Sequence, residues 1–181
     1  MKKKAQSKAL NVILEKAAFL EILAASLEAY KKESIGLLFG LRRKESIIVK
    51  LSFPPQTAKR FYARAEIGKK AEERLISIFE NFARMRMLGF FHSHPEYGDI
   101  QGETKLSDDD INSLSTGEIA IVIAINKSRR NMVWKKNADY TISGTVDHYF
   151  FKIACYFKAE NQNDKKKVTP LEMTIKGLVL D

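Results

Sequence analysis

The chain has 181 residues, of which 45% are hydrophobic and 29% are charged. This length and composition are typical of one globular domain with a buried core, and they exclude a disordered or membrane-embedded chain. Lysine and arginine number 31 against 22 acidic residues, which gives a formal net charge of +9. That balance favours acidic partners, but no nucleic-acid motif accompanies the short basic blocks, so we do not expect nucleic acid to be a partner.

The N-terminus and the cysteine content bear on the compartment. Lysines precede an apolar stretch, but Glu15, Lys16 and Glu21 interrupt it and no small-residue cleavage site follows. No stretch has the apolar length of a membrane span. The single cysteine, Cys155, lies in an apolar run and is expected to be a small buried side chain in a reducing compartment. We therefore expect a cytoplasmic protein with no membrane partner.

The first third of the chain alternates short apolar stretches with one helical period. In order, it predicts a strand at 11–14, a helix at 16–30, a hairpin of strands at 33–40 and 46–51, and a surface loop at 56–65. Pro54 and Pro55 are expected to end the second hairpin strand because proline cannot donate a hydrogen bond to the ladder.

The middle of the chain carries a second amphipathic helix. An apolar stripe predicts this helix at 67–87, with Gly89 in the position of its C-terminal cap. A strand that contains two histidines follows directly, and then a polar loop at 96–105. Ser107 and the three aspartates after it predict the start of a short helix, which Gly117 closes.

The last third is rich in strand signals. In order, it predicts a buried central strand at 119–125, a turn at 127–131, a returning partner strand at 132–134, a strand at 149–157, a polar turn at 161–167 and a last strand within 173–180. The fold class is therefore α/β (mixed α+β), with a mixed sheet flanked by helices. We expect residues 1–181 to form a single domain.

Two histidines end the apolar strand that follows the second helix. Alternate residues of a strand project from the same face, so the imidazoles of His92 and His94 point the same way. Pro95 then ends the run. Two neighbouring imidazoles offer two nitrogen ligands to a metal ion.

Other residues would complete a catalytic zinc site. Such a site typically takes three protein ligands and keeps a fourth position for water, so Asp110 would complete a set with His92 and His94. A carboxylate that does not bind the metal, here Glu33, would act as general acid and base. Ser107 would donate a hydrogen bond to the oxyanion of the tetrahedral intermediate.

Each of these residues also has a structural interpretation. Glu33 follows two lysines near the end of a helix, where a solvated charge is common. Ser107 and Asp110 have the spacing of a capping box, which needs no metal. His148, next to Asp147 in a polar corner, is expected to be structural and not a ligand.

Taken together, these motifs resemble the JAMM or MPN+ zinc metalloproteases. The family pattern is a glutamate before a glycine-containing strand, then His-x-His-Pro, then Ser-x-x-Asp; the chain has them at 33–40, 92–95 and 107–110. The resemblance covers roughly residues 8–135 and leaves a β-rich C-terminal extension at about 140–181. It implies a cytidine-deaminase-like fold around a central, mixed, curved sheet.

The resemblance also implies a function. Zinc would be bound by His92, His94 and Asp110, with Glu33 as general acid/base and Ser107 at the oxyanion. Relatives with the full set are deubiquitinase-like isopeptidases that cleave isopeptide or peptide bonds after the C-terminal tail of ubiquitin or a ubiquitin-like modifier. The expected partners are such a modifier and its conjugates, and an oligomer is left open. Two alternatives remain: a non-catalytic MPN scaffold and a DNA-repair-associated relative.

One interval departs from the family pattern. Fifteen residues, from Pro95 to Asp109, separate His94 from Asp110, and at the shorter family spacing the aspartate would fall on Lys105. A surface loop absorbs extra residues at modest cost, so we assign them to the Gly98–Gly102 segment and keep Asp110 as the ligand. The other aspartates that remain alternative ligands are Asp99, Asp108 and Asp109.

Overall fold

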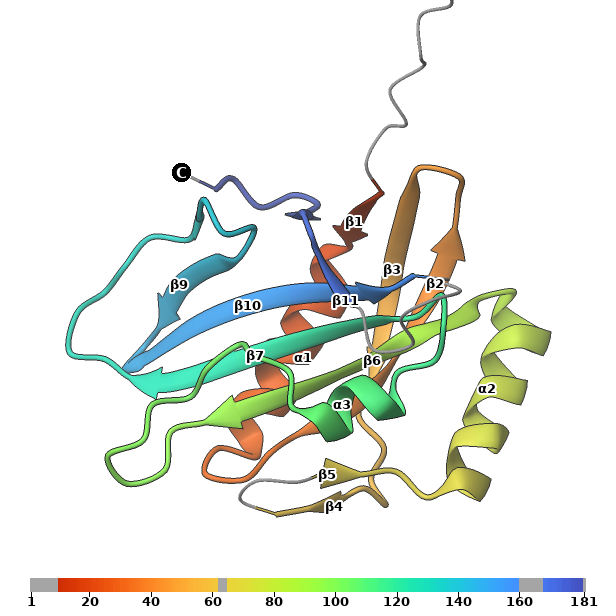
Figure 1. Cartoon of the computed structure of the whole chain (residues 1–181), viewed down its shortest axis with the longest axis horizontal. Helices are drawn as coiled ribbons and strands as arrows, with labels where there is room; N and C mark the ends of the chain where they lie inside the picture. Colours follow the sequence, from red (N-terminus) through yellow and green to blue (C-terminus); the bar gives the residue numbers. More distant parts are fainter. Residues whose placement is uncertain (1–9, 62–64, 160–167, 181) are drawn as a thin grey trace, which may run out of the picture.

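A mixed sheet of ten strands runs through the computed structural model of the chain, which describes residues 10–61, 65–159 and 168–180 (Figure 1). The strand order is β12-β1-β3-β2-β6-β7-β10-β9-β8, with β11 paired to β10. The strands of this sheet are β1 Asn11–Leu14, β2 Ile35–Arg42, β3 Ser46–Phe53, β6 Arg86–Pro95, β7 Ile119–Lys127, β8 Lys135–Lys136, β9 Ile142–Val146, β10 Tyr149–Lys158, β11 Val168–Leu171 and β12 Met173–Ile175. Parallel and antiparallel pairs both occur, which confirms the mixed α/β fold class.

In the described part of the chain, three helices and a small second sheet surround the main sheet. They are α1 Lys16–Glu28, α2 Lys69–Ala83 and α3 Asp108–Ser113, with β4 Lys59–Arg60 and β5 Ala65–Glu66 forming the antiparallel pair. In Figure 1, α1 lies behind the sheet, α3 lies in front of it and α2 lies to one side. The strand β4 and the first residue of β5 fall in the segment 56–65 that was expected to be a surface loop; within that segment the structure does not describe residues 62–64.

The central strand β7 explains why the core has two sides. It lies between β6, which is parallel to it, and β10, which is antiparallel. Ile119, Ile121 and Ile123 face the larger core with α1, whereas Ala120 and Val122 face the smaller core under α3. Because both faces are covered, the strand reads as a continuous apolar run, and its expected central position is confirmed.

Several other predicted elements are confirmed. The opening strand, the first helix, the 33–51 hairpin and the histidine strand all form, and β3 ends at Phe53 before the two prolines. The polar loop after His94 is present, and α3 begins after Ser107 as expected. The polar turn expected at 161–167 lies outside the described residues, and the last strand is shorter than expected, since β12 ends at Ile175.

The end of the second helix was predicted wrongly. The helix α2 stops at Ala83, and Arg84 takes the left-handed conformation at its end with φ 51°. Gly89 therefore does not cap the helix but lies inside β6, with φ 140°. A Cβ at Gly89 would sit 1.9 Å from the Ile119 carbonyl oxygen, so this glycine allows β6 and β7 to approach closely.

The segment after β7 was also predicted wrongly. Residues 132–134 cannot pair with β7, because β6 and β10 already occupy both of its edges. Instead, the backbone carbonyl of Met132 accepts a hydrogen bond from the Thr145 amide of β9, and Trp134 packs edge-to-face on Phe19 at 5.2 Å between ring centroids. The strand β9 (Ile142–Val146) takes the edge of β10 and was not predicted.

The length and polarity of the helices also bear on membrane association. Among residues 10–61, 65–159 and 168–180, no helix is both long and apolar enough to cross a membrane.

Candidate metal centre

The pairing of β2 with β6 brings Glu33 to the histidines. Ile35 lies opposite His92 in this antiparallel pair, and the Ser34 carbonyl accepts a hydrogen bond from the Ser93 amide just beyond the strand end. Continuing the same register places Glu33 opposite His94, and Glu33 Oε1 lies 4.0 Å from His94 Nε2. Two segments about 60 residues apart in sequence therefore meet at one sheet position.

His92 is the buried member of the pair. It lies on β6 opposite Val122 of β7, and only 3% of its surface is exposed. Its Nε2 lies 3.5 Å from Asp110 Oδ1. Within the described part of the chain, neither ring nitrogen makes a hydrogen bond, which is costly for a buried polar group and typical of a ligand position.

His94 is oriented by the loop that follows it. Its Nδ1 lies 2.8 Å from the backbone carbonyl oxygen of Glu103, which can only accept a hydrogen bond. The proton is therefore on Nδ1, and the lone pair of Nε2 is free to bind a metal ion. Burial and the neighbouring His92 lower the pKa of His94, which favours the neutral imidazole that a metal requires.

Asp110 has two roles in the geometry, one for each carboxylate oxygen. Its Oδ2 accepts hydrogen bonds from the Ser107 amide at 2.7 Å and the Ser107 hydroxyl at 2.6 Å, which completes the capping box of α3. Its Oδ1 faces His92. Burial alone would raise the pKa of Asp110, but His92 and the two Ser107 hydrogen bonds outweigh it and hold this pKa well below its usual range.

The ligating atoms of His92, His94 and Asp110 all lie within 4.8 Å of one another. The structure therefore brings together the three residues that the sequence pattern selected. Asp109 faces the same groove, but Asp99 and Asp108 do not line it. His148 lies elsewhere, exposed, with its Nε2 3.4 Å from Asp147 Oδ1.

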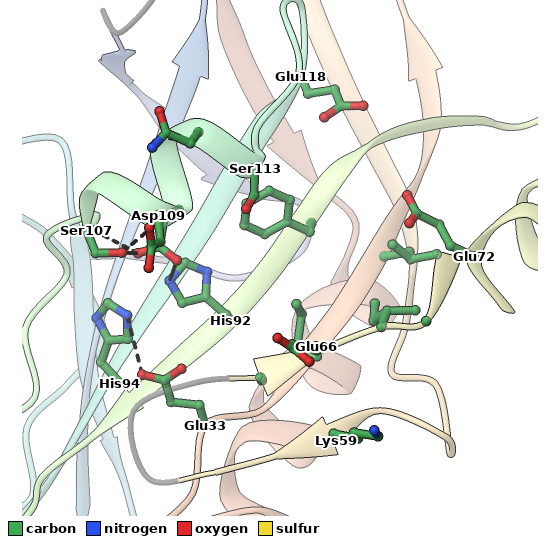
Figure 2. A pocket seen from close by; sticks show the side chains of 18 of the residues that line it. Glu33, Lys59, Glu66, Glu72, His92, His94, Ser107, Asp109, Ser113 and Glu118 are labelled. Carbon is green, nitrogen blue, oxygen red and sulfur yellow. Dashed lines mark hydrogen bonds and ion pairs between the residues drawn. The ribbon is translucent and has the colours of Figure 1, made fainter. Parts of the chain in front are cut away.

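Glu33 lies beside the cluster without belonging to it (Figure 2). Its backbone amide donates a 2.8 Å hydrogen bond to the carbonyl of Phe61, which follows β4. Burial and the negative charge of Asp110 raise the pKa of Glu33 to about 7. A carboxyl group in this state is suited to both accepting and donating a proton near neutral pH.

Three buried serines on the opposite face of β6 hold Glu33 and the histidines together. Ser26, Ser34 and Ser93 are all fully buried. The Ser34 amide donates to Ser93 Oγ at 2.9 Å, and Ser34 Oγ lies 3.0 Å from Ser93 Oγ and 3.3 Å from Ser26 Oγ. Ser34 has one hydroxyl proton, so it donates in one of these contacts and accepts in the other.

We expect Ser93→Ala to lower the free energy of unfolding by about 1–3 kcal/mol, because it leaves the buried Ser34 amide without its acceptor. Urea unfolding measures the change. Ser52→Ala is the matched control, since Ser52 is also buried but its hydroxyl makes only longer contacts, of 3.2 and 3.4 Å. A loss for Ser93→Ala no larger than that for Ser52→Ala would contradict the role of the serine cluster.

A groove of about 1950 Å³ runs away from the cluster. Figure 2 shows His92, His94 and Glu33 at one end and Glu72 of α2 at the other, with Glu66 between them. The groove is lined by parts of β2, β5, β6, α2, α3 and the loop after β6. The cluster therefore lies at one end of an open groove.

The sequence interpretation missed residues that orient the site. The backbone carbonyl of Glu103 contacts the imidazole of His94. A hydrogen bond between Ser34 and Ser93 joins the segments that carry Glu33 and the histidines, and the Asn126 side chain binds the loop at Gly102. Asn126 could have been noticed in the sequence, because it is a polar residue at the end of an otherwise apolar predicted strand. No comparable signal marks a backbone carbonyl such as that of Glu103.

Fold and site together define the class of protein: a mixed α/β domain with a His-His-Asp cluster at the end of a groove. The family described as JAB1/Mov34/MPN/PAD-1 ubiquitin protease matches residues 7–112 of the sequence, and the chain belongs to this family. The expected family assignment is thereby confirmed. At the family level, the chain has a peptidase or scaffold role.

A solved structure supports the same fold. The solution structure of protein DSY2949 from Desulfitobacterium hafniense is similar, with a TM-score of 0.56 and 18% sequence identity, over 91% of this chain and 92% of that chain. At that identity the likeness concerns the fold alone. No curated protein matches the sequence.

Proposed function

We propose that this chain is a zinc-dependent isopeptidase or peptidase that cleaves the bond after the C-terminal tail of ubiquitin or a ubiquitin-like modifier. The observation that carries the proposal is the His92–His94–Asp110 cluster with Glu33 beside it, at the end of a groove. Membership in the ubiquitin-protease family supports the reaction class.

The donor set fits zinc. Two imidazole nitrogens and one carboxylate are common ligands of catalytic zinc, and three protein ligands leave a position open. Among the described residues, no group forms a hydrogen bond with either ring nitrogen of buried His92, and this supports the same assignment because a buried imidazole needs a partner. The hydrogen bond between His94 and the Glu103 carbonyl is the kind of outer contact that fixes a metal-binding histidine.

The metal and the residues around it would carry out different parts of the proposed reaction. Bound zinc would supply Lewis acidity, which makes water nucleophilic near neutral pH and polarises the scissile carbonyl. Glu33 accepts the proton of the attacking water at its carboxylate and passes it to the leaving amine. This role requires Glu33 to face the cluster without being a ligand, which is how its carboxylate lies in Figure 2.

Ser107 is proposed as the oxyanion donor. Its hydroxyl lies next to Asp110 on the groove side of α3. In this structure the hydroxyl proton points to Asp110 Oδ2, so donation to the oxyanion replaces that hydrogen bond. The Ser107 amide keeps its own bond to Asp110 and preserves the helix cap during the exchange.

The groove suits an extended tail as the substrate. Its floor next to the cluster is apolar, with Ile35 and Leu37 of β2 and Phe90 of β6. The short strand β5 borders the groove, and a tail laid along a strand edge would present its backbone carbonyls to the metal position. The groove has more acidic than basic side chains along its walls, which favours a peptide over nucleic acid.

The direct test uses the purified full chain with candidate ubiquitin-like conjugates. We expect cleavage after the modifier's C-terminal residue, loss of cleavage with a chelator, and recovery when Zn²⁺ is added back. Mass spectrometry of the released modifier identifies the bond. Cleavage that persists in chelator-treated, zinc-free protein would remove the metal from the mechanism.

A scaffold role is the second candidate, and one observation favours it. The helix α2 is amphipathic, but part of its apolar face is not covered by the rest of the structure: Ile78 and Phe82 are 52% and 87% exposed. Exposed apolar residues on one helix face are typical of a protein interface. A protein that neither binds zinc nor cleaves any conjugate, but forms a stable complex through α2, would favour the scaffold role over the peptidase.

A further inference from the structure

We infer that Asn126 is a positioning residue for the metal centre: its side-chain amide holds the loop that aims His94. The inference rests on the proposed metal site and extends it to a residue on another strand. The loop concerned is residues 96–105, whose length sets this chain apart from the family spacing. Asn126 reaches this loop from the penultimate position of β7.

The Asn126 amide binds both backbone groups of one loop residue. Its Oδ1 accepts a 2.7 Å hydrogen bond from the Gly102 amide, and its Nδ2 donates a 3.1 Å hydrogen bond to the Gly102 carbonyl. Only 7% of the Asn126 surface is exposed. A buried side chain that pairs with both groups of one residue fixes the position and orientation of the loop there.

Gly102 is pressed directly against the backbone of a proposed ligand. A Cβ on Gly102 would lie 2.1 Å from the His94 carbonyl oxygen, so no larger residue fits without a shift of the loop. In the sheet, His94 lies opposite Ala124 of β7, two residues before Asn126. The amide of Asn126 therefore holds the loop against the backbone of His94, near the end of β6.

The next residue of the loop makes the contact that orients the imidazole. The Glu103 carbonyl accepts from His94 Nδ1 at 2.8 Å, and this single bond sets both the tautomer and the direction of Nε2. Asn126, Gly102, Glu103 and His94 thus form one continuous chain of contacts. A second anchor, from the Tyr156 hydroxyl to the Thr104 carbonyl at 2.9 Å, supports the loop beyond Glu103.

Removing the Asn126 amide should release the loop at Gly102, between the contacts of Glu96 with β7 and of Thr104 with Tyr156. The Gly102 amide and carbonyl lose their partners, and the Glu103 carbonyl is no longer held at a fixed place relative to His94. The ligand itself is untouched, so we expect weaker metal binding and not its abolition. Losses of about 10–100-fold in metal affinity are typical when such outer contacts are removed.

The experiment measures Zn²⁺ affinity by competition with a chromophoric chelator, using the full chain. We expect Asn126→Ala and Gly102→Ala to bind zinc about 10–100-fold more weakly than the wild type. Asn137→Ala is the matched control, because Asn137 makes similar side-chain hydrogen bonds to Thr141 and Ser143 away from the groove. Thermal melting of each metal-free variant verifies that it is folded. Unchanged zinc affinity in folded Asn126→Ala would overturn the inference.

A second readout does not need the metal. The imidazole nitrogen shifts of the three histidines report their tautomers by NMR in metal-free protein at mildly alkaline pH. We expect His94 to be the Nδ1–H tautomer in the wild type and a mixture of tautomers in Asn126→Ala. A wild type that binds no zinc but shows this difference would refute the proposed function and support the positioning role. Identical tautomers in both proteins would refute the positioning role.

Discussion

Replacing Glu33 with glutamine is expected to leave zinc bound and to lower the rate of conjugate cleavage by about 10²–10⁴-fold, the usual worth of general acid–base catalysis. Glutamine has the shape of glutamate but cannot take a proton from water. Glu33 lies 4.0 Å from His94 and outside the ligand cluster, so the metal ligands stay in place. Parallel measurement of zinc affinity and of kcat separates the two effects.

A second groove carboxylate provides the control for Glu33. Burial and the nearby Glu118 also raise the pKa of Glu72, but it lies on α2 at the far end of the groove (Figure 2). We expect Glu72→Gln to keep kcat close to that of the wild type, because Glu72 lies at the far end of the groove from the metal position and any contact with the bound tail would affect KM. If Glu33→Gln kept wild-type kcat, or if it lost zinc, Glu33 would not be the general base.

The sequence predicted the elements whose signals are local. The apolar run at 119–125, the alternation at 149–157 and the helical period at 16–30, of which 16–28 form α1, each depend on side chains whose burial follows from their own spacing. The start of α3 was predictable for the same reason, since Ser107 and Asp110 form the capping box within four residues.

Elements that depend on distant partners were not predictable. Residues 132–134 look like a strand, but whether they can pair with β7 depends on β10, which occupies that edge. The C-terminal end of α2 was missed because Arg84, and not a glycine, adopts the left-handed conformation. Gly89 looked like a cap because the close approach of Ile119 is invisible in the sequence.

The candidate site also contains some residues that sequence patterns predict and some contacts that only the folded structure shows. The period of a strand was enough to predict that His92 and His94 share a face, and the chemistry of a zinc site together with the family motifs selected Glu33 and Asp110. The orienting contacts were not predictable, because the Glu103 carbonyl reaches His94, and the Asn126 amide reaches Gly102, only after the loop folds back on the sheet. Motifs thus identify the groups that do chemistry, whereas the structure identifies the groups that hold them.

Asp110→Ala is expected to reduce zinc affinity by more than about 100-fold, beyond the 10–100-fold that outer contacts contribute, because it removes one of three ligands. It should also lower stability by about 0.5–2 kcal/mol, since Asp110 Oδ2 accepts two hydrogen bonds from Ser107 in the capping box. Isothermal titration with Zn²⁺ and urea unfolding of the metal-free protein measure the two effects separately.

Asp110→Asn separates the ligand from the cap. An asparagine oxygen still accepts the Ser107 hydrogen bonds, but it is a weak zinc ligand without the negative charge, so zinc should be lost while stability is largely kept. Variants of the alternative ligands serve as controls that should keep zinc. We expect Asp99→Ala and Asp108→Ala to bind zinc as the wild type does, because neither residue lines the groove. If Asp99→Ala lost zinc and Asp110→Asn kept it, the loop after His94 would itself supply the third ligand, and Asp110 would be only a helix cap.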